Sequence, residues 1–125
     1  MATRDILIDT SVIIEHLRKQ DKQSTMLYRI AAQYSLYTSS VVEFELWSGA
    51  LDKQKQNDLH VVLQFCTSIP FTTDVAKQAA MIFRSLRQQN QMIEIRDIFI
   101  AATAIEFNLP LLTLNQKHFV RVPKL

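Results

Sequence analysis

Glycine and cysteine are scarce in this chain of 125 residues, which contains one of each. A single glycine, Gly49, excludes the phosphate-binding P-loop and the dinucleotide-binding fingerprint, because each of these motifs needs several glycines. A nucleotide cofactor is therefore not expected. The lone Cys66 excludes a disulfide within the chain and a cysteine-rich zinc site, and it fits a reducing compartment.

Long apolar runs are also missing from the sequence. Its apolar stretches are short and interrupted by charged residues, so no membrane-spanning segment is expected. Residues 1–5 lack the pattern of a signal peptide, and we expect a cytoplasmic protein without membrane contact. The three histidines, His16, His60 and His118, have no spacing typical of a zinc site.

Composition and pattern together indicate an ordinary globular domain. A hydrophobic content of 48% in 125 residues is enough for a buried core, so we expect a single domain over residues 1–125. The net charge of +2 permits nucleic-acid binding without arguing for it.

Short apolar runs alternate with amphipathic segments along the chain. Strands are predicted at residues 6–8, 36–38, 68–71 and 111–113, and helices between them. Ser40 and Glu43 have the spacing of a capping box for one of these helices. The alternation predicts a three-layer α/β/α domain with a short, mainly parallel sheet of four to five strands.

Four segments place a carboxylate or an amide just after an apolar run. They are Ile6-Leu7-Ile8-Asp9-Thr10, Val41-Val42-Glu43-Phe44-Glu45-Leu46, Arg96-Asp97-Ile98-Phe99-Ile100-Ala101-Ala102 and Leu112-Thr113-Leu114-Asn115. In an alternating fold, residues just beyond the carboxyl ends of the strands converge on one crevice. Three carboxylates about 5 Å apart would repel one another by roughly 3 kcal/mol per pair at an effective dielectric near 20. Mg²⁺ or Mn²⁺ relieves such repulsion with hard oxygen ligands, so the pattern predicts a metal-dependent enzyme.

Each of these residues also has a purely structural interpretation. Asp9 and Asp97 are suitable helix caps, Asn115 suits the cap of a last turn, and Glu45 fits a solvent-facing position. The two-residue offset places Glu43 roughly 200° around the helix from Glu45. We therefore assign Glu43 to the cap and Glu45 to chemistry.

Taken together, the segments resemble the PIN-domain ribonucleases, and most closely the VapC toxins of bacterial toxin–antitoxin pairs. Asp9 matches the family's first-strand aspartate, Glu45 its E-L-x-x-G helix, and Asp97 its D-x-x-I-A-A-x-A helix. The end of the chain, residues 113–125, matches the closing T-x-N-x-x-x-F-x-x-V-P-x-L pattern. The resemblance covers nearly the whole chain, with all four segments in order.

The resemblance implies a metal-dependent endoribonuclease. Asp9, Glu45 and Asp97 would hold one or two Mg²⁺ or Mn²⁺ ions, and Asn115 would be a neutral fourth catalytic member where the family often has an acid. The ions would polarise a phosphodiester and activate a water, leaving 5′-phosphate and 3′-hydroxyl ends. The resemblance further implies an RNA substrate, a homodimer and a VapB-like antitoxin that blocks the site.

Neighbouring residues receive supporting roles. Thr10 or Ser11 would orient Asp9 or a metal-bound water. Possible contacts to the RNA backbone are His118, Lys117, Arg121, Lys77, Arg84 and Arg87, and a solvated surface role stays open for each. Glu94 is expected to be a loop charge rather than a further ligand.

Two other functions stay open at this point. The runner-up is a catalytically silent binding module with the same fold, whose acidic cluster engages an arginine of a partner. A phosphoacceptor receiver domain is a more distant alternative, suggested by Asp9 after the first strand. Metal-dependent RNA cleavage by the purified chain would separate the nuclease from both.

Overall fold

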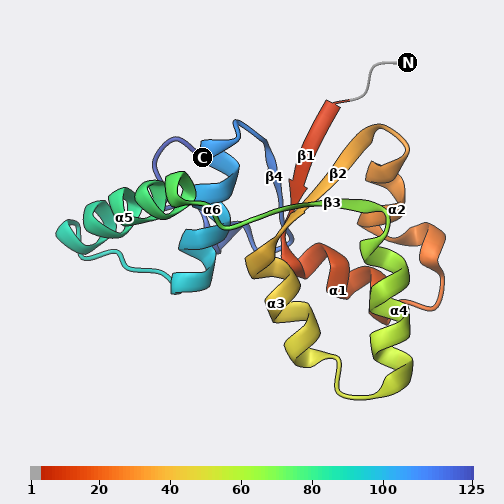
Figure 1. Ribbon diagram of the computed structural model, residues 1–125. Coiled ribbons are helices and arrows are strands. Elements are labelled where there is room, and N and C mark those ends of the chain that lie inside the picture. The colour runs from red at the N-terminus through yellow and green to blue at the C-terminus, as the bar shows by residue number, and fades with distance from the viewer. Residues whose placement is uncertain (1–3) are drawn as a thin grey trace.

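A parallel sheet forms the centre of the computed structural model, which describes residues 4–125 (Figure 1). The strands are β1 (Arg4–Ile8), β2 (Tyr34–Ser39), β3 (Cys66–Ile69) and β4 (Leu111–Leu112). Their order is β3-β2-β1-β4, and all three pairings are parallel. The predicted three-layer α/β/α fold is confirmed, with four strands in the described part of the chain. Residues 1–3 lie outside it, so most of the segment used for the signal-peptide prediction is not described.

Helices cover both faces of the sheet. They are α1 (Thr10–Arg18), α2 (Met26–Ala31), α3 (Ser40–Gly49), α4 (Lys53–Leu63), α5 (Thr73–Gln88) and α6 (Ile95–Glu106), with short 3-10 turns η1 (Lys22–Ser24) and η2 (Gln116–His118). Figure 1 shows α5 and α6 together on one side of the sheet and α1, α2 and α4 on the other. No helix within residues 4–125 is long and apolar enough to cross a membrane.

The inner strand β1 and helix α6 each carry fully buried apolar side chains. Leu7 and Ile8 at the end of β1 are fully buried, because helices cover this strand on both faces. On α6, Ile98 and Ile100 are also fully buried. Burial of this kind contributes about 1.5–3 kcal/mol per large apolar side chain, so the elements that carry Asp9 and Asp97 are firmly anchored.

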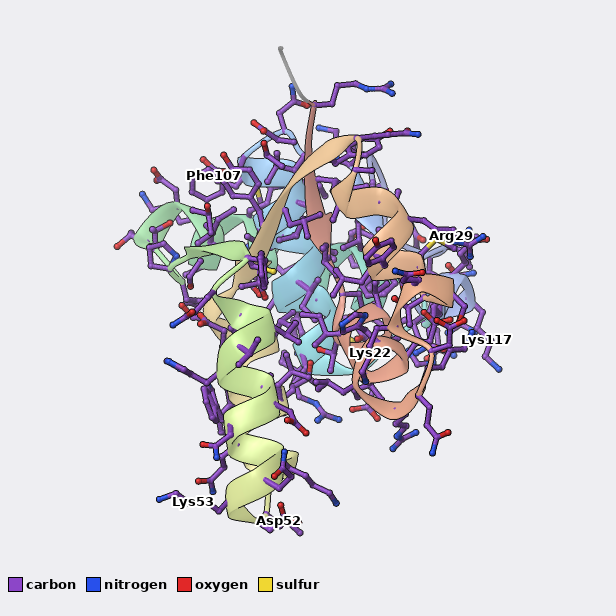
Figure 2. All side chains as sticks on the ribbon, turned by 90° about the vertical axis from the view of Figure 1, so that its right-hand side faces the viewer. Lys22, Arg29, Asp52, Lys53, Phe107 and Lys117 are labelled. Carbon is purple, nitrogen blue, oxygen red and sulfur yellow. The ribbon has the colours of Figure 1, made fainter. Side chains whose placement is uncertain are left out.

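The carboxyl ends of the strands lie at the same end of the molecule as the beginnings of α1, α3 and α6 (Figure 1). Helix α6 runs from there toward the opposite end, where Phe107 is labelled in Figure 2. Asp52 and Lys53, at the start of α4, mark the other extremity in that view. The topology therefore gathers the segments after β1, β2 and β4 with the first turn of α6.

The third strand begins and ends earlier than predicted. It spans Cys66–Ile69 rather than residues 68–71, because its hydrogen bonds follow the parallel partner β2, with Leu36 opposite Cys66 and Ser39 opposite Ile69. Pro70, which lacks an N–H, follows the strand instead of lying in it. In the sheet, β3 is an edge strand.

The predicted capping box at Ser40 and Glu43 is wrong. The backbone of Ser39 is extended, and its hydroxyl accepts the hydrogen bond from Val42 N–H at 3.2 Å, so Ser39 is the cap and Ser40 is the first helical residue. Glu43 instead accepts a hydrogen bond from Ser68 of β3. The box fails because β2 extends one residue further than the sequence indicates.

Candidate active site

Asp9 is held rigidly at the end of β1. Its backbone N–H donates to Leu112 of β4 at 2.9 Å, and the residue is only 4% exposed. One carboxylate oxygen, Oδ1, accepts from the Thr10 N–H at 2.8 Å, so Asp9 itself caps α1. The other oxygen, Oδ2, accepts from the hydroxyls of Ser11 at 2.9 Å and Thr113 at 2.7 Å. Asp9 therefore caps helix α1, as its structural interpretation predicted, and this role is compatible with its proposed role as a site acid.

Glu45, on α3, contacts Thr10, the residue that follows Asp9. Its Oε1 accepts from the Thr10 hydroxyl at 2.7 Å, and its Oε2 forms an ion pair with Arg96 Nη1 at 3.0 Å. The Glu45 side chain is 15% exposed, so the predicted alternative of a solvent-facing charge is wrong. Thr10 touches Asp9 only through its backbone N–H, and Ser11 is the one of the two whose hydroxyl orients Asp9.

Asp97 lies in the first turn of α6. The helix begins at Ile95 with Glu94 in the capping position, so Asp97 is not the cap that its structural interpretation suggested. Burial raises the pKa of the Asp97 carboxyl above its ordinary value, and the charges of Asp9 and Glu45 raise it further. His118 opposes this rise in the Asp97 pKa, with its Nδ1 3.3 Å from Asp97 Oδ2.

These carboxylates share one cavity of about 490 Å³. The residues proposed for the site that line it are Asp9, Thr10, Ser11, Glu45, Asp97, Asn115 and His118. Glu94 and Arg96 line it as well, so Glu94 is more than a remote loop charge. Perturbation of a carboxyl pKa by neighbouring acids inside a cavity is typical of functional sites.

A second, more open cleft of about 650 Å³ continues from the first. It shares Asp97 and His118 with the acidic cavity and adds the cationic side chains of Lys117 and Arg121. The other proposed phosphate contacts, Lys77, Arg84 and Arg87, belong to α5 and line neither of these two cavities. The structure thus separates the six candidates into a group of three beside the acids and a group of three on α5.

The donor set suits a divalent cation in its chemistry. Asp9, Glu45 and Asp97 offer hard carboxylate oxygens to one cavity, as Mg²⁺ and Mn²⁺ require. Within residues 4–125, however, no group of three acidic, histidine or cysteine side chains is already arranged to hold a metal ion. In this arrangement, Thr10 contacts one oxygen of Glu45 and Arg96 contacts the other. A cation would fit here once Glu45 exchanges a partner.

Two residues that contact the acids of the cavity were not assigned a role from the sequence. Thr113 donates to Asp9 and accepts from Asn115 N–H at 2.9 Å, linking the ends of β1 and β4. Its position at the end of the strand predicted over residues 111–113, beside the segment that carries Asn115, was an available signal. Arg96 neutralises Glu45, and only its place beside Asp97 in the sequence pointed to the site.

Comparison with known proteins agrees with this geometry. The sequence matches the PIN domain family over residues 6–125. It is 34% identical over 128 residues to Ribonuclease VapC of Rickettsia bellii, with 96% of this chain and 92% of that protein covered. It is 30% identical over 123 residues to Ribonuclease VapC19 of Mycobacterium tuberculosis, with 95% of each chain covered.

The fold is also shared with solved toxin–antitoxin structures. One chain in the crystal structure of VapBC2 from Rickettsia felis, bound to a DNA fragment from their promoter, superposes with a TM-score of 0.86 at 27% identity. That match covers 96% of this chain and 94% of the other. VapBC-1 from nontypeable Haemophilus influenzae, at 22% identity and a TM-score of 0.80, shares the fold. The chain therefore belongs to the PIN-domain family, among the VapC ribonucleases.

Proposed function

We propose that this chain, acting as one domain over residues 1–125, is a metal-dependent endoribonuclease and the toxin of a VapBC toxin–antitoxin module. One observation carries the proposal: carboxylates from three distant segments, Asp9, Glu45 and Asp97, line a single cavity at the carboxyl ends of the strands. Relatives that match nearly the full chain are named ribonucleases of the VapC type, which supports RNA as the substrate.

Asp9, Glu45 and Asp97 would hold Mg²⁺ or Mn²⁺. The bound ion would supply a Lewis acid that polarises the phosphodiester and makes an attacking water more acidic. The chain's own residues fix the ligands, since Ser11 and Thr113 orient Asp9 while Thr10 orients Glu45. Such hydrogen bonds hold an acid in the geometry that the reaction needs and reduce its freedom to reorganise.

The substrate would enter beside η2. Asn115 forms no capping hydrogen bond through its side chain, and it is exposed at the rim of the acidic cavity. Its amide is suited to hydrogen-bond a water or an RNA oxygen as a neutral member of the site. Lys117, His118 and Arg121 line the adjoining cleft, where they would contact backbone phosphates. Hydrolysis by an activated water would leave a 5′-phosphate and a 3′-hydroxyl.

A VapB-like antitoxin would cover a neighbouring apolar surface. A cavity of about 250 Å³ between α1, α3 and α4 is lined by apolar residues such as Ile14, Leu17, Leu46 and Leu59. It shares Arg18 and Glu45 with the acidic cavity, so a segment bound there would reach the carboxylates and block them. The VapBC assemblies with the same fold support such a partner. The expected homodimer rests on the family resemblance.

The decisive experiment is incubation of the purified chain with total tRNA and mRNA, with Mg²⁺, with Mn²⁺ and with a chelator. We expect new RNA ends with 5′-phosphates that appear only with metal and are absent with Asp9→Asn. A folded wild-type chain that creates no metal-dependent ends would contradict the nuclease and favour the catalytically silent binding module. End mapping would also identify the RNA target and the cleavage sequence.

A further inference from the structure

Arg96 places a cation inside the acidic cavity. Its Nη1 lies 3.0 Å from Glu45 Oε2, and its Nη2 lies 3.2 Å from Glu94 Oε2. The guanidinium therefore bridges two carboxylates that come from different elements. The hydrogen bond with Glu94 and the charge of Glu45 raise the pKa of Arg96 above its ordinary value, so its positive charge is permanent.

A divalent cation and this guanidinium compete for Glu45. A metal ligated by a carboxylate oxygen lies about 2.1 Å from it, and the guanidinium nitrogen lies 3.0 Å from one of the same oxygens. Two cations on one carboxylate repel each other, and the second oxygen already accepts from Thr10. One cation must leave before the other gains the full negative charge of Glu45.

The exposures indicate which side chain moves. The Glu45 side chain is 15% exposed and held by Thr10, whereas the Arg96 side chain is 50% exposed. A half-exposed ion pair contributes little net stability, because solvent screens it and both partners are readily rehydrated. Arg96 can therefore swing outward at small cost, whereas Glu45 stays in the cavity.

The mouth of the cavity offers Arg96 a second partner. Glu94, its other carboxylate, lines both the acidic cavity and the cleft that contains Lys117 and Arg121. A guanidinium released beside Glu94 therefore faces the region where an RNA phosphate would lie. Its planar fork of donors matches two phosphate oxygens at once.

We propose that Arg96 exchanges partners, pairing with Glu45 in the metal-free protein and with an RNA phosphate when a divalent cation is bound. This inference rests on the proposed nuclease function, which supplies both the metal and the RNA. The exchange makes metal binding and RNA binding mutually supportive, because the metal frees the cation that the phosphate needs. Arg96 is thus assigned a role in substrate binding as well as in neutralising the metal-free site.

The first test measures metal affinity without RNA, by calorimetric titration of Mn²⁺. Arg96→Gln removes the competitor and should tighten Mn²⁺ binding by about tenfold, on the scale where tenfold corresponds to about 1.4 kcal/mol. Arg18→Gln is the matched control, because it removes the same charge from the cavity lining without breaking any ion pair found within residues 4–125. Equal Mn²⁺ affinities of Arg96→Gln and Arg18→Gln would overturn the proposal.

A double variant distinguishes direct competition from a general effect of charge. In a Glu45→Gln background the ion pair between Arg96 and Glu45 is already absent and only the pair with Glu94 remains, so adding Arg96→Gln should change Mn²⁺ affinity far less than it does in the wild-type background. If Arg96→Gln tightens binding equally in both backgrounds, Arg96 acts only through its distant field and the exchange does not occur. Melting curves in chelator verify that the wild type, the three single variants and the double variant are folded.

The second test measures RNA binding, by anisotropy of a labelled single-stranded oligonucleotide with Ca²⁺ as the probe ion and a gel to verify that the RNA stays intact. Wild-type affinity should rise on adding Ca²⁺, and Arg96→Gln should lose most of that rise. An equal rise in both proteins would refute the phosphate contact. The Mn²⁺ titration needs no RNA, so the two hypotheses can fail separately. If Arg96→Gln binds Mn²⁺ more tightly than the wild type but the wild type cleaves no RNA, the nuclease function is contradicted and the competition between Arg96 and the metal still stands.

Discussion

Asp9 and Glu45 line the same cavity but are held by different kinds of partner. Asp9 is 4% exposed and accepts three hydrogen bonds from neutral donors, the Thr10 N–H and two hydroxyls. Glu45 has a neutral donor on one oxygen and the Arg96 guanidinium on the other. Buried neutral hydrogen bonds persist at any ionic strength, whereas a half-exposed ion pair is screened by salt. One carboxylate is thus fixed in place, and the other is able to change its partner.

The difference follows from the elements that carry the two acids. Asp9 directly follows the inner strand β1. The neighbouring strand β4 places Thr113 close enough to donate a hydrogen bond to Asp9. Glu45 and Arg96 lie on two different helices, α3 and α6, and both line the cavity. A strand end therefore holds one acid rigidly, whereas the acid on a helix can exchange its partner.

The largest expected effect is at the rigid acid. Asp9→Asn should abolish metal-dependent RNA cleavage and the growth inhibition caused by inducing the chain in a bacterial host, because the amide cannot replace a charged ligand. Asp5→Asn, on the exposed part of the same strand, is the matched control and should stay active. Equal growth inhibition by wild type and Asp9→Asn at matched protein levels would remove the catalytic role of Asp9.

The second effect compares the two acids of α3. Mn²⁺ at about 100 times its Kd should stabilise the wild type by roughly 2.7 kcal/mol, because it binds the folded state and relieves carboxylate repulsion. Glu45→Gln should lose most of the resulting rise in melting temperature. Glu43→Gln should keep it, since Glu43 contacts Ser68 of β3 instead of lining the acidic cavity. A loss of the metal response in Glu43→Gln alone would reverse the two assignments.

A smaller effect is expected at Thr113, which supports the rigid acid without being an acid itself. Thr113→Val removes one hydrogen bond to Asp9 and should lower the free energy of unfolding by about 1 kcal/mol, measured in urea. It should also slow cleavage, because Asp9 would lose a partner that fixes its orientation. Thr67→Val, an exposed position of β3, is the control. No change in either measurement would show that Ser11 and Thr10 suffice to hold Asp9.

The order of strands and helices along the chain could be predicted because the spacing of the apolar residues in each segment is typical of either a strand or a helix. The run at residues 6–8 is apolar on both sides, and in the structure it becomes the central strand, covered on both faces. The ends of elements are less certain, since they depend on partners far along the chain. Ser39 replaces Ser40 as a cap because β2 pairs with β3 as far as Ile69.

The same contrast holds for the candidate site. That Asp9, Glu45 and Asp97 lie at one cavity could be predicted from the sequence, because their segments have fixed places relative to strands and helices. The hydrogen bond from Thr113 to Asp9 connects residues 104 positions apart in the sequence. The ion pair of Arg96 with Glu45 likewise connects two distant segments. No periodicity reports which distant side chains meet, so these contacts required the structure.

The smallest expected effect is the pH dependence of the third acid in the metal-free protein. Burial raises the pKa of the Asp97 carboxyl, and the charges of Asp9 and Glu45 add to the rise while His118 opposes it. A carboxyl with a raised pKa in the folded state stabilises the fold fully below its ordinary pKa, and this stabilisation is lost as the pH rises through the folded value. Metal-free Asp97→Asn should therefore unfold at a slightly higher urea concentration than the wild type near neutral pH.

That advantage should shrink as the pH falls toward about 4, because the wild-type Asp97 then becomes protonated and uncharged like the amide. The measurement is urea unfolding of both proteins in chelator across this range, with Asp5→Asn as an exposed control. If Asp97→Asn is the less stable protein at neutral pH, the contact between Asp97 and His118 outweighs burial and the charges of the other acids. Asp97 would then resemble Glu45, as an acid held chiefly by a basic side chain.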